Sequence, residues 1–202
     1  MHLRPLPRSA HPWRTAVETV LGPFASAGRL ALRAAGRSGP LDPAGLRRIV
    51  FIKIDHLGDV IMATPLLRAL KVWAPRASLT VVARPASRAV LDRLPFVDHV
   101  QVAEPPWILQ YTTSRQSLTA CLALARRLRA ARYDLAIALR YHNRWDSLLL
   151  SLSGARRRLG FDAGGFGFGL THRAPWPRRG HEIDRGAEAL EAHLGKDEYD
   201  AF

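Results

Sequence analysis

The residues best suited to chemistry lie between Arg47 and Pro65, where an apolar run leads into a glycine turn and then into a helical pattern. Asp59 follows Gly58 at this turn. Ligands of open α/β sheets bind beyond the carboxyl ends of the strands, so a carboxylate here lies where reactions usually occur. An ionised carboxylate can accept a proton from an attacking hydroxyl group. Asp59 is therefore a candidate general base, and a helix cap is the alternative interpretation.

The turn itself is expected to bring the backbone close to a ligand. Gly58 permits a tight turn, and the free N–H groups of the turn that follows favour negative charge nearby. Lys53 lies at the end of the apolar run, and we expect it, like Gly58, to lie where the backbone comes close to a ligand. Asp55 and His56 are interpreted as turn residues, with contact between His56 and a ligand as the alternative.

Short apolar runs alternate with segments of helical period from Arg47 onward, which predicts βαβ units, an α/β fold and a parallel sheet. The predicted strands are 49–54, 79–83, 99–102, 134–139 and 158–161. Helices are expected near 65–73, 86–94, 118–128, 144–152 and 183–194. Pro65 is predicted to start the first regular helix, after a looser turn over 59–64.

The third predicted helix has the clearest apolar face. That face is expected to consist of Leu118, Cys121, Leu122, Ala125 and Leu128. The single cysteine rules out an internal disulfide, and we expect it to be buried, reduced and inert, as in a cytoplasmic protein.

A chain of 202 residues suits one main domain, and its formal net charge is +13, from 30 Lys and Arg against 17 Asp and Glu. This charge favours anionic partners, although an arginine-rich proteome would produce it equally well. Nucleic acid is not expected as a partner, because no recognition motif or aromatic platform is visible. We expect neither a signal peptide nor a membrane span, because the first residues lack a compact apolar core with a cleavage site and no apolar run approaches ~18 residues.

Residues 1–46 differ from the rest, with repeated prolines and arginines around an interrupted amphipathic segment. This extension could lie on the inner face of an anionic membrane, or it could simply cover the sheet. Residues 47–195 are predicted to form the α/β domain. The polar tail 196–202 stands where a further domain would be expected.

Several segments between 47 and 195 together form a pattern of fixed order and spacing. The matching segments are 52–60, 63–70, 133–140, 153–161 and 170–175, together with His181. In this pattern the chain resembles glycosyltransferase family 9, which contains the ADP-heptose:lipopolysaccharide heptosyltransferases.

The resemblance implies the N-terminal, acceptor-side half of a GT-B glycosyltransferase, with a Rossmann-like parallel sheet and helices on both faces. It implies inverting transfer from a nucleotide-sugar such as ADP-heptose to a lipopolysaccharide or envelope glycan, with Asp59 as general base and without a metal or other cofactor. The nucleotide site of the family lies mainly on a C-terminal domain that has no counterpart here. We therefore expect no transfer without a separate C-terminal half.

Acceptor-side candidates follow two of the predicted strands, on the rim that should carry Asp59. Arginines there could bind phosphates or acidic sugars through two hydrogen bonds. The candidates are Arg84, Arg140, His142, Asn143 and Arg144. Arg84 could instead be a surface cation, and His142 and Asn143 could cap the next helix. The glycine loop 164–169 is interpreted as a flap or as an ordinary turn, and His172 and His181 lack metal-ligand spacing.

The competing hypothesis is a basic Rossmann-like module that binds anionic glycolipid without turnover. Under either hypothesis we expect a cytoplasmic protein, and contact of the basic extension with the inner face of the membrane stays one of its two interpretations.

Overall fold

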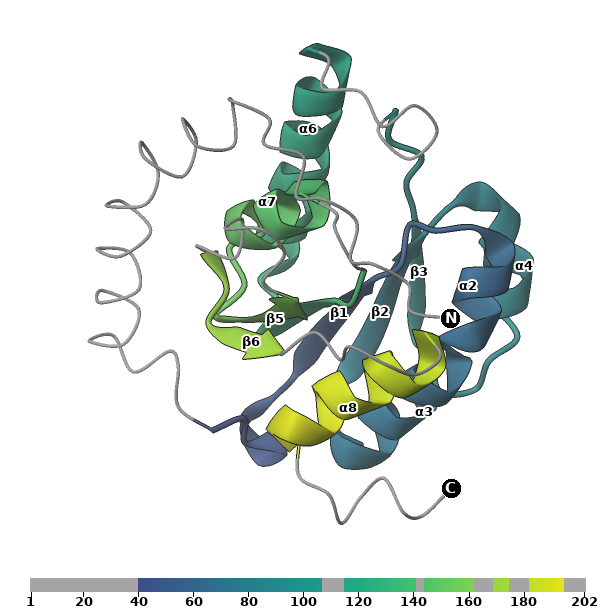
Figure 1. The fold of residues 1–202 in the computed structure, drawn as a ribbon, viewed down its shortest axis with the longest axis vertical. Coiled ribbons are helices and arrows are strands. Elements are labelled where there is room, and N and C mark those ends of the chain that lie inside the picture. Colours follow the sequence, from purple (N-terminus) through teal and green to yellow (C-terminus); the bar gives the residue numbers. More distant parts are fainter. Residues whose placement is uncertain (1–39, 107–114, 141–143, 162–168, 175–181, 195–202) are drawn as a thin grey trace, which may run out of the picture.

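A parallel sheet of six strands forms the middle layer of the structure, in the order β3-β2-β1-β4-β5-β6 (Figure 1). The structure is a computed structural model, and it describes residues 40–106, 115–140, 144–161, 169–174 and 182–194. The strands are β1 (Arg48–Ile52), β2 (Ser78–Ala83), β3 (His99–Val102), β4 (Leu135–Ala138), β5 (Arg157–Phe161) and β6 (His172–Ala174).

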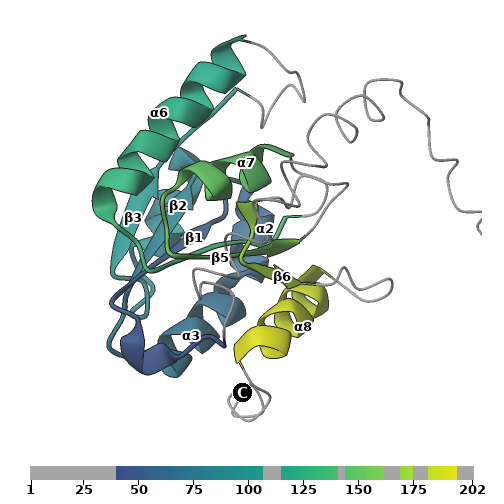
Figure 2. The same cartoon turned by 90° about the vertical axis from the view of Figure 1, so that its left-hand side faces the viewer.

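Helices cover both faces of the sheet, as Figure 2 shows: α6 and α7 lie on one side, and α3 and α8 lie on the other. The α-helices are α2 (Leu57–Met62), α3 (Thr64–Trp73), α4 (Arg88–Leu91), α6 (Arg115–Ala131), α7 (Arg144–Leu152) and α8 (Glu182–Leu194). Two 3₁₀ turns, η1 (Pro43–Gly45) and η2 (Pro85–Ser87), precede β1 and α4.

The apolar run of β1 is continuous because both faces of this central strand are buried. Side chains alternate along a strand, so Ile49 and Phe51 join the core beneath α3 and α8. Val50 and Ile52 join the second core, beneath α6 and α7. These two cores produce the helix–sheet–helix layers of a Rossmann-like α/β fold.

The order of the strands places a topological switch point beyond the carboxyl ends of β1 and β4, and we call this position the crevice. The chain first builds the sheet outward from β1 to β3 and then crosses back to place β4 against the other side of β1. Two crossovers therefore leave in opposite directions at this point, which is where open α/β sheets bind their ligands.

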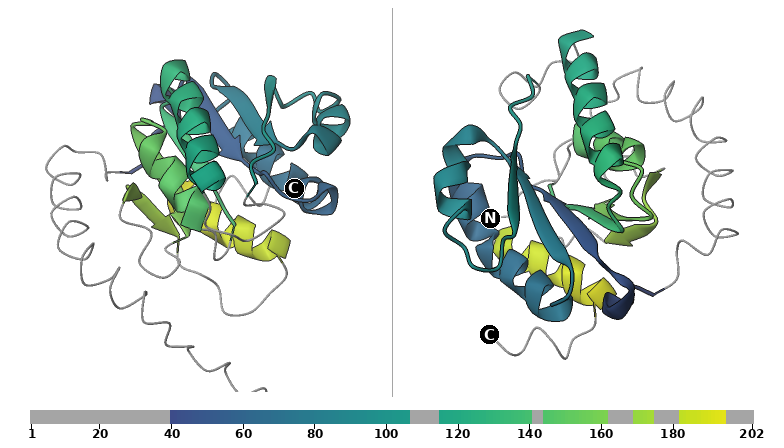
Figure 3. Two further views of the ribbon diagram at one scale, coloured as in Figure 1. Left: turned by 90° about the horizontal axis from the view of Figure 1, so that it is seen from above. Right: turned by 180° about the vertical axis from the view of Figure 1, so that it is seen from behind.

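Helices from the early and the late part of the described chain pack together on one face of the sheet. Helix α8, yellow in Figures 1 and 3, lies along α3 from the first βα unit. Gly186 makes this contact possible, because a Cβ atom there would stand 2.6 Å from Cδ1 of Leu66.

The predicted strands agree with the observed ones to within two residues at each end, and 99–102 agrees fully. The structure adds β6, which was not predicted from the sequence.

The looser turn predicted over 59–64 is wrong, because residues 57–62 form the regular helix α2. The helix predicted near 86–94 is shorter than expected, since α4 covers only Arg88–Leu91. Gly154, where the fourth helix was predicted to stop, has φ 73° and follows α7 in the left-handed conformation.

The predicted apolar face of α6 needs correction. Leu118 and Leu122 are 46% and 37% exposed, whereas Leu124 is buried. Cys121 is fully buried, as expected. Burial, with the nearby Asp146 carboxylate as a second cause, raises the pKa of the Cys121 thiol to about 11.

The Cys121 thiol should therefore be inert in the folded protein. At pH 7.5 the thiolate is the minor species, and the side chain has no exposed surface, so a thiol reagent such as Ellman's reagent should leave it unmodified. Full reaction is expected after unfolding in urea. Rapid labelling of the folded protein would contradict this prediction.

Several predictions fall outside the described residues. These are residues 1–39 of the extension, the tail 196–202, the glycines 164–168, and His142, Asn143 and His181. No helix in the described ranges is long and apolar enough to cross a membrane.

Asp98 fixes the turn before β3. Lys71 Nζ and the Leu79 N–H both donate to its Oδ2 atom, each at 2.7 Å. Burial alone would raise the pKa of Asp98, but the ion pair with Lys71 and these hydrogen bonds hold it below its ordinary value.

A pH-dependent loss of stability should follow from Asp98→Asn. A depressed carboxylate pKa stabilises the fold above the unfolded-state value of 3.8, and the effect disappears as the pH falls through the folded-state value. Because the pair is partly exposed, we expect a loss of only about 1 kcal/mol at pH 7 and almost none at pH 3, by urea unfolding. Asp92→Asn, at an exposed pair with Arg88, is the control. An equal loss at both pH values would contradict the prediction.

Candidate active site

A buried carboxylate joins β1 to β4 at their carboxyl ends. Asp55 Oδ2 lies 2.9 Å from Lys53 Nζ, and Asp55 Oδ1 lies 2.9 Å from Arg140 Nε. Lys53 and Asp55 have side-chain exposures of 7% and 5%, so the pair is screened from water. Two cations therefore share one anion at the crevice between the strands.

This cluster determines where Arg140 lies. The arginine follows β4, and its ion pair with Asp55 fixes it across the crevice from the end of β1. The pair uses Nε, while the two terminal nitrogens of the guanidinium carry further donors. The Arg140 side chain remains partly exposed, so these donors can meet a ligand at the rim.

Asp59 lies in the first turn of α2, next to the same rim. The N-cap of α2 is His56, whose side chain makes no capping hydrogen bond. The interpretation of Asp59 as a helix cap is therefore wrong. Its side chain is half-buried, and its carboxylate has no hydrogen bond or ion pair within the part of the chain that the structure describes. An unpaired carboxylate of this kind is free to accept a proton.

Asp59 and Lys53 line one small cavity beneath the rim. The other lining residues are Phe51, Met62, Ala63, Leu66, Leu139 and Gly186. Its volume is about 10 Å³, roughly that of one water molecule. A sugar cannot enter this space, so a substrate would have to lie on the open rim above it.

Arg84 also lies at the carboxyl edge, directly after β2, with its side chain 17% exposed. Its Nη2 atom pairs with Glu104 Oε1 at 2.8 Å, after the end of β3. Its Nε atom is buried and has no hydrogen-bond partner among the described residues. Arg84 therefore combines an ion pair with one unused donor, and the turn η2 that follows it contacts α2.

The remaining site predictions concern Gly58 and the residues after β4. Gly58 is the second residue of α2 and has no left-handed conformation, so the tight turn expected there is wrong. A Cβ atom at Gly58 would meet open space, which leaves room for close approach. Arg144 begins α7, and its side chain lies outside the described part of the structure, as do His142 and Asn143.

The roles of Asp55 and Glu104 were not predicted from the sequence. Residues i and i+2 of an extended segment point the same way, so a lysine at the end of a buried strand and an aspartate two positions later can pair. That spacing was visible for Lys53 and Asp55. No comparable local signal connects Arg84 with Glu104, twenty residues away.

Comparison with solved structures extends these observations. No family model and no curated protein matches the sequence. A glycosyl transferase family 9 structure from Veillonella parvula DSM 2008 matches with TM-score 0.65 and 28% identity, covering 75% of this chain and 42% of that one. The resemblance to glycosyltransferase family 9 is confirmed.

Two Escherichia coli structures share the fold of this family 9-like chain. ADP-heptose lps heptosyltransferase II matches with TM-score 0.58 and 23% identity, over 70% of this chain and 40% of that chain. Heptosyltransferase WaaC with ADP-2-deoxy-2-fluoro heptose matches with TM-score 0.59 and 16% identity, over 75% and 49%. The chain thus spans less than half the length of each of these three proteins.

Proposed function

We propose that this chain is the acceptor-binding, N-terminal half of an inverting glycosyltransferase. Its partner half would bind a nucleotide-sugar such as ADP-heptose, and its acceptor would be a lipopolysaccharide or another envelope glycan. The single observation that carries the proposal is the unpaired Asp59 carboxylate beside the crevice between β1 and β4. The likeness to family 9 and to ADP-heptose enzymes supports the choice of reaction.

Asp59 would act as general base in a direct displacement. Its carboxylate accepts the proton of the acceptor hydroxyl while that oxygen forms a bond to the anomeric carbon of the donor sugar. The bond from that carbon to the diphosphate breaks at the same time, and the diphosphate leaves with the electron pair. Attack from the face opposite the leaving group inverts the anomeric centre.

The acceptor would be held by the cations on the rim. Arg140 is fixed by Asp55 and keeps its terminal donors, which suits a phosphate or an acidic sugar of the acceptor. Arg84 offers a second cation at the same edge, although Glu104 already neutralises part of its charge. We therefore assign the larger share of acceptor binding to Arg140.

The exposed apolar residues at this edge suit a second protein domain above the rim. Leu57 and Ile61 lie one turn apart on α2, at 40% and 49% exposure, and flank Asp59 in sequence. The three solved structures are more than twice as long as the part that matches. A donor-binding domain placed here would cover these side chains and close the site from water.

Acceptor binding by the chain alone tests the proposal. Titration with a truncated lipopolysaccharide oligosaccharide should give saturable binding, and Arg140→Gln should weaken it about tenfold. Arg156→Gln removes the same charge from an exposed site before β5 and should leave binding unchanged. Absence of saturable binding, or equal loss in both variants, would reject the acceptor role.

Binding without turnover is the second candidate function. If a donor-binding domain, supplied separately, never yields product while acceptor binding persists, the chain is a glycolipid-binding module.

A further inference from the structure

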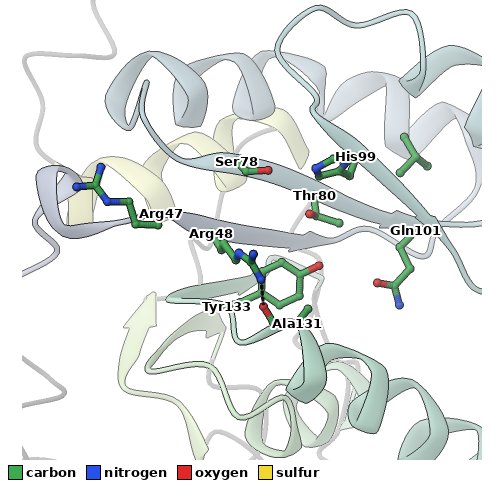
Figure 4. Close-up of a pocket in the computed structure, with 9 residues that line it drawn as sticks. Arg47, Arg48, Ser78, Thr80, His99, Gln101, Ala131 and Tyr133 are labelled. Atoms are coloured by element: carbon green, nitrogen blue, oxygen red, sulfur yellow. Dashed lines mark hydrogen bonds between the residues drawn. The ribbon is translucent and has the colours of Figure 1, made fainter.

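A second and much larger cavity lies at the opposite edge of the sheet from Asp59. Its volume is about 530 Å³, within the range of pockets that hold small molecules. It opens at the amino ends of β1, β2 and β3, next to the end of α6 (Figure 4). The lining residues are Arg47, Arg48, Ser78, Thr80, His99, Val100, Gln101, Ala131 and Tyr133.

Polar side chains dominate one face of the sheet at this pocket. Strand register places Arg48 beside Ser78, and Thr80 beside His99. Further along the same face, Ile52 and Val82 are apolar and belong to the core beneath α6. The change from apolar to polar within single strands marks where the apolar core beneath α6 ends in the described part of the chain, because a fully covered face would carry apolar residues.

The pocket has a positive charge that no lining carboxylate balances. Arg48 Nη1 donates to the Ala131 carbonyl at 2.9 Å, which orients the guanidinium without neutralising it. Figure 4 shows this contact beside Tyr133, with Thr80 and His99 on the strands above. Two carboxylates stand beside the pocket without lining it: Asp134 accepts from the backbone N–H groups of Arg47 and Arg48, and Asp98, next to His99, is paired with Lys71.

Gln101 supplies the observation that points most directly to a ligand. Its Nε2 atom is buried and has no hydrogen-bond partner among the residues that the structure describes. A buried amide donor without a partner costs free energy, so such groups are normally satisfied by protein, water or ligand. Gln101 lines the pocket, and because its Nε2 atom is buried the amide must rotate toward the pocket before a bound acceptor atom can satisfy it.

We infer that this pocket binds a small phosphorylated and hydroxylated molecule, such as a sugar phosphate. The Arg48 guanidinium suits the phosphate group, while the hydroxyls of Ser78, Thr80 and Tyr133 and the amide of Gln101 suit the sugar hydroxyls. The site is independent of the proposed transfer reaction. Lys53 follows Arg48 by five positions, which is about 17 Å along an extended strand.

The chain's own N-terminal extension is a poor occupant of the pocket. Residues 1–39 contain six arginines and one glutamate, so their charge has the same sign as that of the pocket. Like charges repel, and the cationic lining therefore favours an anionic guest over this segment.

Calorimetric titration of the full chain tests the assignment. Glucose 6-phosphate should bind saturably, inorganic phosphate more weakly, and glucose not at all. Arg48→Gln should reduce the affinity for glucose 6-phosphate at least tenfold, because the charged partner of the phosphate is lost. Gln101→Leu should also weaken binding while leaving the melting temperature equal or higher, since it removes a buried donor that has no partner.

Arg156→Gln is the matched control, because it removes one exposed charge beside β5 and should leave affinity unchanged. No saturable binding of either phosphate compound would overturn the assignment, as would equal weakening in the control. Vesicles of phosphatidylglycerol form a separate arm. If vesicles bind in an Arg48-dependent manner but glucose 6-phosphate does not, the guest is a lipid headgroup and the inference fails.

Discussion

Asp59→Asn is expected to lower sugar transfer by about two to four orders of magnitude, the usual contribution of a general base. The amide keeps the size of the side chain but cannot accept the acceptor's proton at neutral pH. Asp59 makes no ion pair among the described residues, so the fold should lose little stability. The measurement is the rate of product formation with a nucleotide-heptose, a truncated lipopolysaccharide acceptor and a donor-binding domain added to this chain.

Asp92→Asn is the control for this experiment, because Asp92 is an exposed carboxylate paired only with Arg88 on α4. It should transfer sugar at the rate of the unmodified chain. Acceptor affinity should be similar in both variants, which separates loss of chemistry from loss of binding. Transfer that survives Asp59→Asn would remove this residue from the reaction.

The largest stability effect should come from Asp55→Ala. This change leaves the Lys53 ammonium buried without its anion, and it releases Arg140 from the crevice. Breaking one partner of a buried ion pair costs about 3–5 kcal/mol, because the remaining charge has lost both water and its counterion. Unfolding in urea, monitored by circular dichroism, measures the loss.

A paired replacement distinguishes the buried charge from simple loss of packing. Lys53→Met/Asp55→Leu removes both charges while keeping apolar volume, and we expect it to recover most of the stability that Asp55→Ala loses. Arg140 remains partly exposed to water in this variant. If the double variant is as unstable as Asp55→Ala, the ion pair is not the source of the effect.

Periodicity was sufficient to predict most of the fold. Strands buried on both faces are continuous apolar runs, so β1, β2 and β4 were visible as such in the sequence. Strand β6 was missed because its three residues, His172–Ala174, are too short to display a period and include two polar side chains. Helix α2 was missed because Gly58 and the nearby Pro65 both suggested a break.

The location of the candidate site could be predicted from the sequence, but the contacts between its side chains could not. Parallel strands bring their carboxyl ends to one edge, which placed Asp59, Arg84 and Arg140 near one rim. Whether an arginine there is free or paired depends on carboxylates from other segments, such as Glu104, and pattern analysis does not supply such pairings. The larger pocket was invisible for the same reason, since its polar residues come from separate strands and each alone resembles an ordinary strand start.

The contact of α8 with α3 has a consequence for synthesis on the ribosome. Helix α3 is made early, but Ala189 and Leu190 of α8 complete the apolar core on its face of the sheet. While the intervening hundred or so residues are translated, the leucines of α3 lack their final cover. The nascent chain must therefore expose an apolar surface until α8 leaves the exit tunnel, and during that interval chaperone capture competes with self-association.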